Sequence, residues 1–368
     1  MANRDIVVIG ASAGGINALL DLVGALPPLP AALFVVVHTS PEPDGLLPKI
    51  IERSGSWKAA VATDGSRIRH GLIHVAPPDC HLLLRRSGIR VVRGPRENRF
   101  RPAIDPLFRT AAETYGSRVI GIVLSGGLDD GTHGLELIKR HGGIAIVQDP
   151  EEAIQPSMPL SALRHVEVDH ILRAGEIGET LSQLVAEEVE VEPHDNATKE
   201  QPDVAEGTAQ NEKIAEGRPP SPFTCPECGG ALWELEGGSV LRYRCHVGHG
   251  YTADSLLVDQ SDSLENAMWA ALRALEEHGM LRRRLAEHAL QSGRRLEART
   301  LELDAKATEL RASTIRRLLR EGQPGQPHDD DDDDASLLSS GRKPTTRRKP
   351  TNRRSGQGRP RNGRQANR

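Results

Sequence analysis

Ser12 stands in the glycine-rich segment Gly-Ala-Ser-Ala-Gly-Gly, which directly follows the apolar run Ile-Val-Val-Ile at residues 6–9. The apolar run predicts a short buried strand, and residues 16–23 predict the helix that follows it. Gly10 and Gly14 flank the serine at G-x-S-x-G spacing, which lets the backbone turn sharply and leaves the hydroxyl exposed. The start of a helix also offers free N–H groups to a developing oxyanion. The pattern therefore favours a nucleophilic serine.

Other interpretations of this turn remain, because glycine-rich turns also bind phosphates or do no chemistry at all. The dinucleotide fingerprint G-x-G-x-x-G is not met, since Ser12 occupies its second glycine position. A short-chain dehydrogenase needs a Tyr-x-x-x-Lys pair, and no lysine stands four positions after Tyr115, Tyr243 or Tyr251. The nucleophile is the interpretation that we favour.

A nucleophilic serine needs a base and an acid that orients the base. His38 ends a second apolar run, and Asp129 and Asp130 follow a third one through a glycine turn. The carboxyl ends of parallel strands line one crevice, so these side chains should meet Ser12 at the same edge. Each has an ordinary alternative, since a strand-end His is often structural and Asp before Gly often forms a turn. The order Ser, His, Asp excludes the α/β-hydrolase arrangement, in which the acid precedes the histidine.

Several longer motifs point to one family. Over residues 6–184 the chain resembles the catalytic domain of the chemotaxis protein-glutamate methylesterases of the CheB type. The motifs that carry the resemblance are the turn around Ser12, Val-Val-His at 36–38, Val-Ala-Pro-Pro-Asp at 75–79, Gly-Pro-Arg-Glu-Asn at 94–98, Arg-Pro-Ala-Ile-Asp-Pro-Leu-Phe at 101–108, Leu-Ser-Gly at 124–126, Asp-Gly at 130–131, Gln-Asp-Pro at 148–150 and Pro-Ser-Met-Pro at 156–159.

The resemblance implies an α/β fold with a doubly wound, mostly parallel sheet in three layers. By position it implies Ser12 as nucleophile, His38 as base and Asp130 as orienting acid, with Asp129 as the competing carboxylate. The implied reaction removes methyl esters from glutamate side chains of chemoreceptor-type proteins and releases methanol. Whether glutamine deamidation also occurs stays open, and the catalysis needs no cofactor.

The surroundings of the nucleophile follow from the same chemistry. We expect the backbone N–H groups near Ala13 and Gly14 to hold the oxyanion. The segment from Arg96 to Arg101 should border the site. Its arginines either guide an acidic helical substrate or are solvated loop charges, and both interpretations remain open.

This chain departs from the usual family pattern in two places. Chemotaxis members usually carry Gly-Met-Gly where this chain has Gly126-Gly127-Leu128, which bears on pocket shape and substrate preference. Typical members also have an N-terminal receiver domain, whereas the first strand begins at Asp5 here, so we expect a stand-alone form. A second hypothesis is a methylesterase-like scaffold of little activity that binds a chemosensory or signalling partner.

A metal site is predicted far downstream. Cys225 and Cys228 form a C-x-x-C turn, and Cys245 and His249 follow as C-x-x-x-H. Four thiolate or imidazole ligands at such paired spacings are typical of structural zinc. His246 is a rival ligand at a strained spacing, and a redox C-x-x-C would leave the later pair unexplained. We expect a small zinc ribbon or knuckle with a β-hairpin between the two pairs.

Composition changes along the 368 residues predict the domain organisation. We expect a catalytic domain at 1–188 that acts without the remaining parts, followed by a disordered linker at 189–221. A zinc-binding module should span 222–254, and a helical region 255–321, broken into a hairpin at Gln291–Gly293. Residues 322–368 should form a disordered tail with an acidic block and a basic end.

The net charge and the absence of targeting signals limit the expected cellular location and the expected binding partners. The net charge is −4, no signal-peptide pattern is present, and the apolar runs are too short for a membrane span. We therefore expect a cytoplasmic protein without membrane insertion. Nucleic acid is not an expected partner, because no aromatic platform accompanies the basic tail. The expected partners are methylated chemoreceptor-type proteins and other chemosensory complex components.

Overall fold

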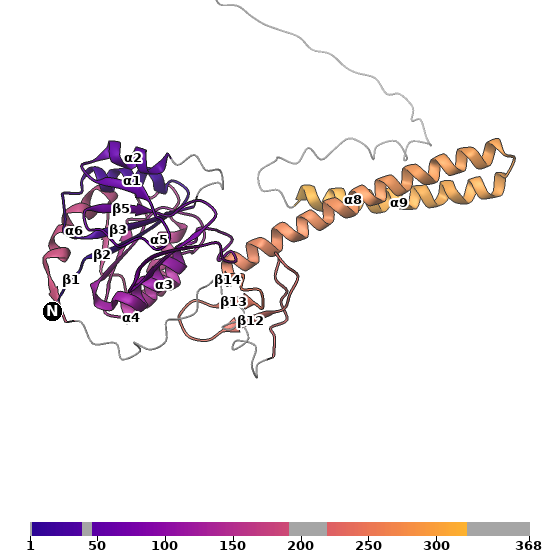
Figure 1. The fold of residues 1–368 in the computed structure, drawn as a ribbon. Coiled ribbons are helices and arrows are strands. Elements are labelled where there is room, and N and C mark those ends of the chain that lie inside the picture. Colours follow the sequence, from indigo (N-terminus) through magenta and orange to yellow (C-terminus); the bar gives the residue numbers. More distant parts are fainter. Residues whose placement is uncertain (1, 39–45, 191–218, 322–368) are drawn as a thin grey trace, which may run out of the picture. The chain divides into compact units, whose positions relative to one another are not determined.

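The structure is a computed structural model that describes residues 2–38, 46–190 and 219–321 (Figure 1). Met1–Ile315 form one compact unit and Arg316–Arg368 a second. The expected tail, and all of the expected linker except its first two and last three residues, lie outside the described residues. The predicted catalytic residues, the predicted metal ligands and most of the helical region all belong to the first unit.

A seven-stranded parallel sheet lies at the centre of the first unit, in the order β10-β9-β8-β2-β3-β5-β4 among the described residues. The chain first builds the half that contains β3, β4 and β5, with β5 between β3 and the edge strand β4, and then crosses to the other side of β2 to add β8, β9 and β10 in turn. In doubly wound sheets, ligands bind at such a switch point, beyond the carboxyl ends of the strands. The strands are β2 (Ile6–Ala11), β3 (Ala32–Val37), β4 (Lys58–Val61), β5 (Leu72–Val75), β8 (Val119–Val123), β9 (Ile144–Gln148) and β10 (His170–Leu172).

Helices cover both faces of the sheet (Figure 1), which explains why β2, β3 and β8 are buried along their whole length. One face packs on α1 (Gly15–Gly24), α2 (Leu47–Ser54) and α6 (Ile177–Ala186). The other packs on α3 (Ile104–Tyr115), α4 (Thr132–Arg140), α5 (Ser157–His165) and the hairpin of β6 (His81–Arg85) and β7 (Gly88–Val92). The predicted three-layer α/β fold is confirmed.

Two very short strands lie outside the main sheet, where β1 (Ala2–Asn3) pairs antiparallel with β11 (Glu188–Val189). No helix in the described ranges is both long and apolar enough to cross a membrane.

The cysteine-containing segment folds as an antiparallel three-stranded sheet of β12 (Leu232–Leu235), β13 (Arg242–Cys245) and β14 (Gly250–Thr252). The sequence predicts the hairpin of the first two strands but misses β14. That strand has only three residues, which is too short for an alternating pattern to be recognised. We call residues 222–254 the Cys/His module.

Two helices follow, α8 (Ala253–Gln291) and α9 (Arg295–Glu321). The break between them falls where the sequence predicts it, and Gly293 there has a φ of 76°. Helix α8 begins two residues before the expected start of the helical region at residue 255. Thr252 caps its first turn by accepting a hydrogen bond from the Ser255 N–H, and this cap adjoins the last strand of the module.

Candidate active site

Three neighbouring strands bring the predicted catalytic residues to one edge of the sheet. Strand β2 pairs with β3 on one side and with β8 on the other, all parallel. Ser12 directly follows β2, His38 directly follows β3, and Asp130 lies in the turn between β8 and α4.

The three side chains form a hydrogen-bonded row. His38 Nδ1 lies 3.0 Å from Ser12 Oγ, and His38 Nε2 lies 2.8 Å from Asp130 Oδ2. An ionised carboxylate only accepts hydrogen bonds, so Nε2 carries the proton and Nδ1 is left as the acceptor that faces the serine hydroxyl. This is the geometry in which a histidine acts as general base toward a serine.

Asp130 is fully buried and surrounded by donors. The N-terminus of α3 supplies the N–H of Ile104 at 2.6 Å and that of Asp105 at 3.2 Å, and the Asn98 amide donates at 2.9 Å. Burial opposes the charged form, but the hydrogen bond and charge of His38, with these donors, lower the pKa of Asp130 below its usual value. The carboxylate therefore stays ionised and orients the histidine.

The turn around Ser12 leaves two backbone donors for an oxyanion. The N–H of Ser12 donates to Ser125 O at 2.9 Å, and that of Gly15 donates to Ser12 O at 2.8 Å. The N–H groups of Ala13 and Gly14 lie between these two, at the start of α1, as the sequence predicts. A Cβ at Gly126 would lie 2.8 Å from Ser12 Cβ, so only glycine lets the loop after β8 pass this close.

Asp129 and Asp130 are both buried but have different partners. Asp129 Oδ1 accepts a hydrogen bond of 2.8 Å from Thr252 Oγ1, the N-cap of α8, whereas Asp130 binds His38. Burial, more than any other cause, raises the pKa of Asp129 to about 7. The structure thus joins His38 to Asp130, and Asp129 to the C-terminal part of the unit.

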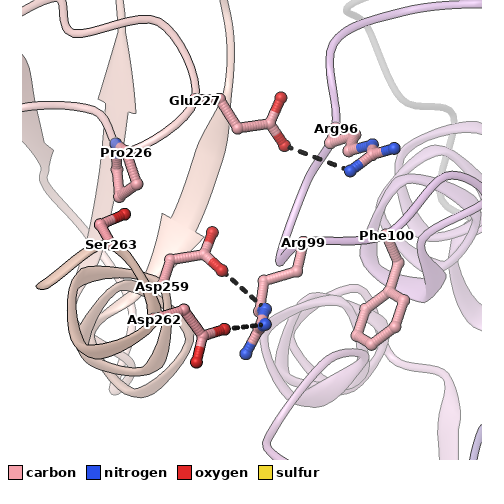
Figure 2. A pocket seen from close by; sticks show the side chains of 8 residues that line it. All are labelled: Arg96, Arg99, Phe100, Pro226, Glu227, Asp259, Asp262 and Ser263. Atoms are coloured by element: carbon pink, nitrogen blue, oxygen red, sulfur yellow. Dashed lines mark hydrogen bonds and ion pairs between the residues drawn. The ribbon is translucent and has the colours of Figure 1, made fainter. Parts of the chain in front are cut away.

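The two arginines expected near the site have different surroundings. The side chain of Arg101 donates to Asp79 Oδ1 at 2.8 Å and to Gly94 O at 2.7 Å, so it holds its own loop together. Arg96 is half exposed and lies 3.8 Å from Glu227 of the Cys/His module, beside a pocket of about 500 Å³ (Figure 2). Of the two, only Arg96 lines this pocket.

The four predicted metal ligands lie together, with all their ligand atoms within 4.8 Å of one another. His249 Nδ1 lies 3.6 Å from the Sγ atoms of both Cys225 and Cys245, and the Sγ atoms of Cys228 and Cys245 are 3.7 Å apart. Tetrahedral zinc with ordinary Zn–S bonds requires ligand separations of about 3.8 Å, so the arrangement fits that ion. His249 Nε2 lies 3.1 Å from Glu227, the kind of carboxylate partner that orients a ligating histidine.

Some residues around the triad were not assigned a role from the sequence. Asn98 bridges Asp130 and Asp105, donating to each at 2.9 Å, and Phe100 stacks on His38. Burial and the nearby Asp130 charge raise the pKa of Asp105. Asn98 lies within a motif that carries the family resemblance, yet nothing in the sequence places it beside Asp130.

A Ser–His–Asp row at the carboxyl edge of a parallel sheet, with helix-start N–H groups beside the serine, is the arrangement that serine hydrolases use. The order of the three residues along the chain separates it from the α/β-hydrolase arrangement. The fold and the site thus define a class, and comparison with known proteins defines the family within it.

The sequence profile of a family described as CheB methylesterase matches residues 7–181. A putative protein-glutamate methylesterase/protein-glutamine glutaminase of Leptospira interrogans is 39% identical over 184 residues, which are 50% of this chain and 95% of the relative. Protein-glutamate methylesterase/protein-glutamine glutaminase 2 of Methanosarcina acetivorans is 34% identical over 50% of this chain and 54% of its own length. The crystal structure of the Thermotoga maritima CheB methylesterase catalytic domain is 33% identical, covers 50% of this chain and 100% of that one, and has a TM-score of 0.48.

The chain belongs to the CheB methylesterase family. The matched region contains the sheet and the catalytic row, whereas the Cys/His module and the two long helices lie beyond the profile match.

Proposed function

We propose that this protein hydrolyses the methyl esters of glutamate side chains in chemoreceptor-type signalling proteins. The observation that carries the proposal is the hydrogen-bonded row of Ser12, His38 and Asp130 at the carboxyl edge of the sheet. The names of the relatives support a methyl ester of a protein glutamate as the substrate.

The proposed reaction has two halves. His38 Nδ1 takes the proton of Ser12 as Oγ attacks the ester carbonyl, and the N–H groups of Ala13 and Gly14 hold the oxyanion. His38 then gives that proton to the departing methoxide, so methanol leaves and an acyl-enzyme remains. Water attacks the acyl-enzyme with His38 again as base, which frees the glutamate carboxylate and regenerates the serine. Asp130 holds the imidazole in the required tautomer throughout.

Glutamine deamidation would use the same residues, with ammonia in place of methanol as the product. Both activities are named for the relatives, and the same acyl-enzyme would serve both. The proposed partners are therefore methylated or glutamine-bearing receptors and the chemosensory components assembled with them. The proposal also places the protein in the cytoplasm, a reducing compartment that would keep its four cysteines from forming disulfides.

We also assign Cys225, Cys228, Cys245 and His249 as the ligands of one structural zinc ion. The ligand separations support this choice, and four protein ligands leave no open position for a reacting water. His249 would bind through Nδ1 while its Nε2 stays with Glu227.

Release of labelled methanol from methylated receptor fragments tests the activity. Purified full-length protein should release methanol, and matched fragments with glutamine at the same positions, assayed for ammonia, would show whether deamidation occurs. Binding of the fragments without any release would instead support the alternative function of a scaffold.

A further inference from the structure

The loop that borders the catalytic row is held by the C-terminal part of the same unit. Four consecutive loop residues, 96–99, each contact the Cys/His module or the first turns of α8, and Figure 2 shows the outer contacts. The contacts are Arg96 Nη1 to Glu227 Oε1 at 3.8 Å, Glu97 Oε1 to Arg244 Nη2 at 3.2 Å, Asn98 N to Gly250 O at 2.9 Å, and Arg99 Nε to Asp259 Oδ1 at 2.7 Å.

The contacts of Glu97 and Asn98 are part of a buried interior, whereas those of Arg96 and Arg99 lie at its partly exposed edge. The exposed fractions are 4% for Glu97, 5% for Asn98 and 1% for Thr252. Burial opposes the ionisation of Glu97, but the guanidinium groups of Arg109 and Arg244 hold its pKa well below its usual range. Removal of the module would leave this charge with one of its two cations and would expose the loop to water.

One chain of hydrogen bonds runs from the module to the catalytic acid. The Thr252 N–H donates to Asn98 Oδ1 at 3.0 Å, which fixes the orientation of the amide. With its oxygen held there, the amide nitrogen points the other way and donates to Asp130 and Asp105, both at 2.9 Å. Without that donor the amide oxygen keeps only the long contact from Ser255 Oγ at 3.5 Å, and the amide is less firmly held against turning over to present its oxygen to Asp130, where the two acceptors would repel.

A second route reaches the catalytic base. Asn98 and Arg99 have φ angles of 50° and 76°, in the left-handed region, which Asn tolerates but which Arg adopts only when its surroundings hold it there. Arg99 is held by ion pairs to Asp259 and Asp262 of α8. Phe100 follows directly and stacks on His38, so the conformation in which Arg99 is held sets the position of the ring against the imidazole.

We propose that the Cys/His module and the first turns of α8 are a positioning element of the catalytic site, acting on Asp130 through Asn98 and on His38 through Phe100. This inference rests on the proposed esterase activity. It replaces the sequence-based expectation that residues 1–188 act alone, because Asn98 takes its orientation from Thr252, 154 residues away along the chain.

Two substitutions at Thr252 test the key hydrogen bond in the full-length protein. Thr252→Pro removes the backbone N–H, and the N-cap φ of −77° is compatible with proline. Thr252→Val keeps the N–H. Both variants lose the hydroxyl that caps α8 and binds Asp129, so the difference between them reports the loss of the Thr252 N–H, which donates to Asn98 Oδ1 and, within the same cap, to Ser255 Oγ, each at 3.0 Å.

The readout is steady-state hydrolysis of a small soluble ester, together with the rate at which Ser12 reacts with a fluorophosphonate. Thr252→Pro should lower kcat and the labelling rate about tenfold or more relative to Thr252→Val. KM should change little, because the substitution disturbs the orientation of the catalytic side chains and not the binding of the ester. Equal kcat values and labelling rates in the two folded variants would overturn the inference. An inactive wild-type protein would instead count against the proposed function.

If Thr252→Pro does not fold, a second variant tests the same inference. The double change Asp259→Asn and Asp262→Asn removes the ion pairs of Arg99, which Figure 2 shows beside the pocket. It should lower kcat several-fold at constant KM and unchanged helix content. Wild-type kcat in this folded variant would overturn the inference.

Discussion

The ring of Phe100 lies flat against the imidazole of His38, with the ring centroids 3.6 Å apart and an angle of 9° between the planes. This contact restricts the imidazole to one plane, in which Nδ1 reaches Ser12 and Nε2 reaches Asp130. An aromatic face also stabilises the imidazolium that forms when His38 takes the serine proton.

Loss of this ring should therefore impair the base without removing it. We expect Phe100→Ala to lower kcat by about tenfold, because the imidazole becomes free to leave the plane shared with Ser12 and Asp130. Phe100→Tyr keeps the ring and should retain most of the activity. Steady-state kinetics on a small ester would compare the two, and equal rates in both variants would show that the stacking has no catalytic role.

The two adjacent carboxylates should differ sharply in their effect on turnover. Asp130→Asn should reduce kcat by about three orders of magnitude or more, since an amide no longer enforces the required histidine tautomer. Asp129→Asn is the matched control and should matter little, because its Oδ1 can still accept the Thr252 hydroxyl. The opposite ranking would move the orienting role to Asp129.

The raised pKa of Asp129 predicts that the stability of the folded protein depends on pH. The folded-state pKa of about 7 lies above its ordinary value of 3.8, so the folded state binds the Asp129 proton more tightly than the unfolded state does. The stabilisation that this provides is complete below about pH 4 and is lost as the pH rises to about 7. Asp129→Asn does not titrate, so its melting temperature relative to wild type should increase between pH 5 and pH 8. A constant or decreasing difference would contradict the raised pKa.

The metal site predicts about one zinc ion per chain in protein purified from zinc-containing medium. Cys225→Ser should release the ion and destabilise the Cys/His module, because each ligand supplies one of four bonds. Cys80→Ser is the matched control, since Cys80 is the cysteine outside the cluster and should leave the zinc content unchanged. Elemental analysis that finds no zinc in the wild type would refute the assignment.

Much of the sheet and the catalytic row could be predicted from local patterns. The runs that became β2, β3 and β8 are continuously apolar because helices cover both faces of the sheet, and such runs are easily recognised. Ser12, His38 and Asp130 follow these runs, so the parallel arrangement alone brings them to a common edge. The ligand spacing of the cysteine cluster is equally local.

No local sequence pattern predicts the contacts between the Cys/His module and the active site. Thr252 meets Asn98 and Asp129 through single polar atoms, at separations of 154 and 123 residues. A buried polar contact between distant residues leaves no periodicity in either segment, and strand β14, which carries Gly250 and Thr252, is too short to be predicted. The division of the chain at residue 188 therefore looked like a functional boundary from the sequence alone.

The central claim is that Ser12 is the nucleophile of a methylesterase. The most direct test measures methanol release from one methylated receptor fragment by the full-length protein and by its Ser12→Ala variant. The substitution removes one partly buried hydroxyl and should leave the fold and melting temperature nearly unchanged. We predict that wild type releases methanol with turnover and that Ser12→Ala releases none above the uncatalysed rate. A folded Ser12→Ala protein with turnover near that of wild type would contradict the assignment of Ser12 as nucleophile and, with it, the proposed mechanism.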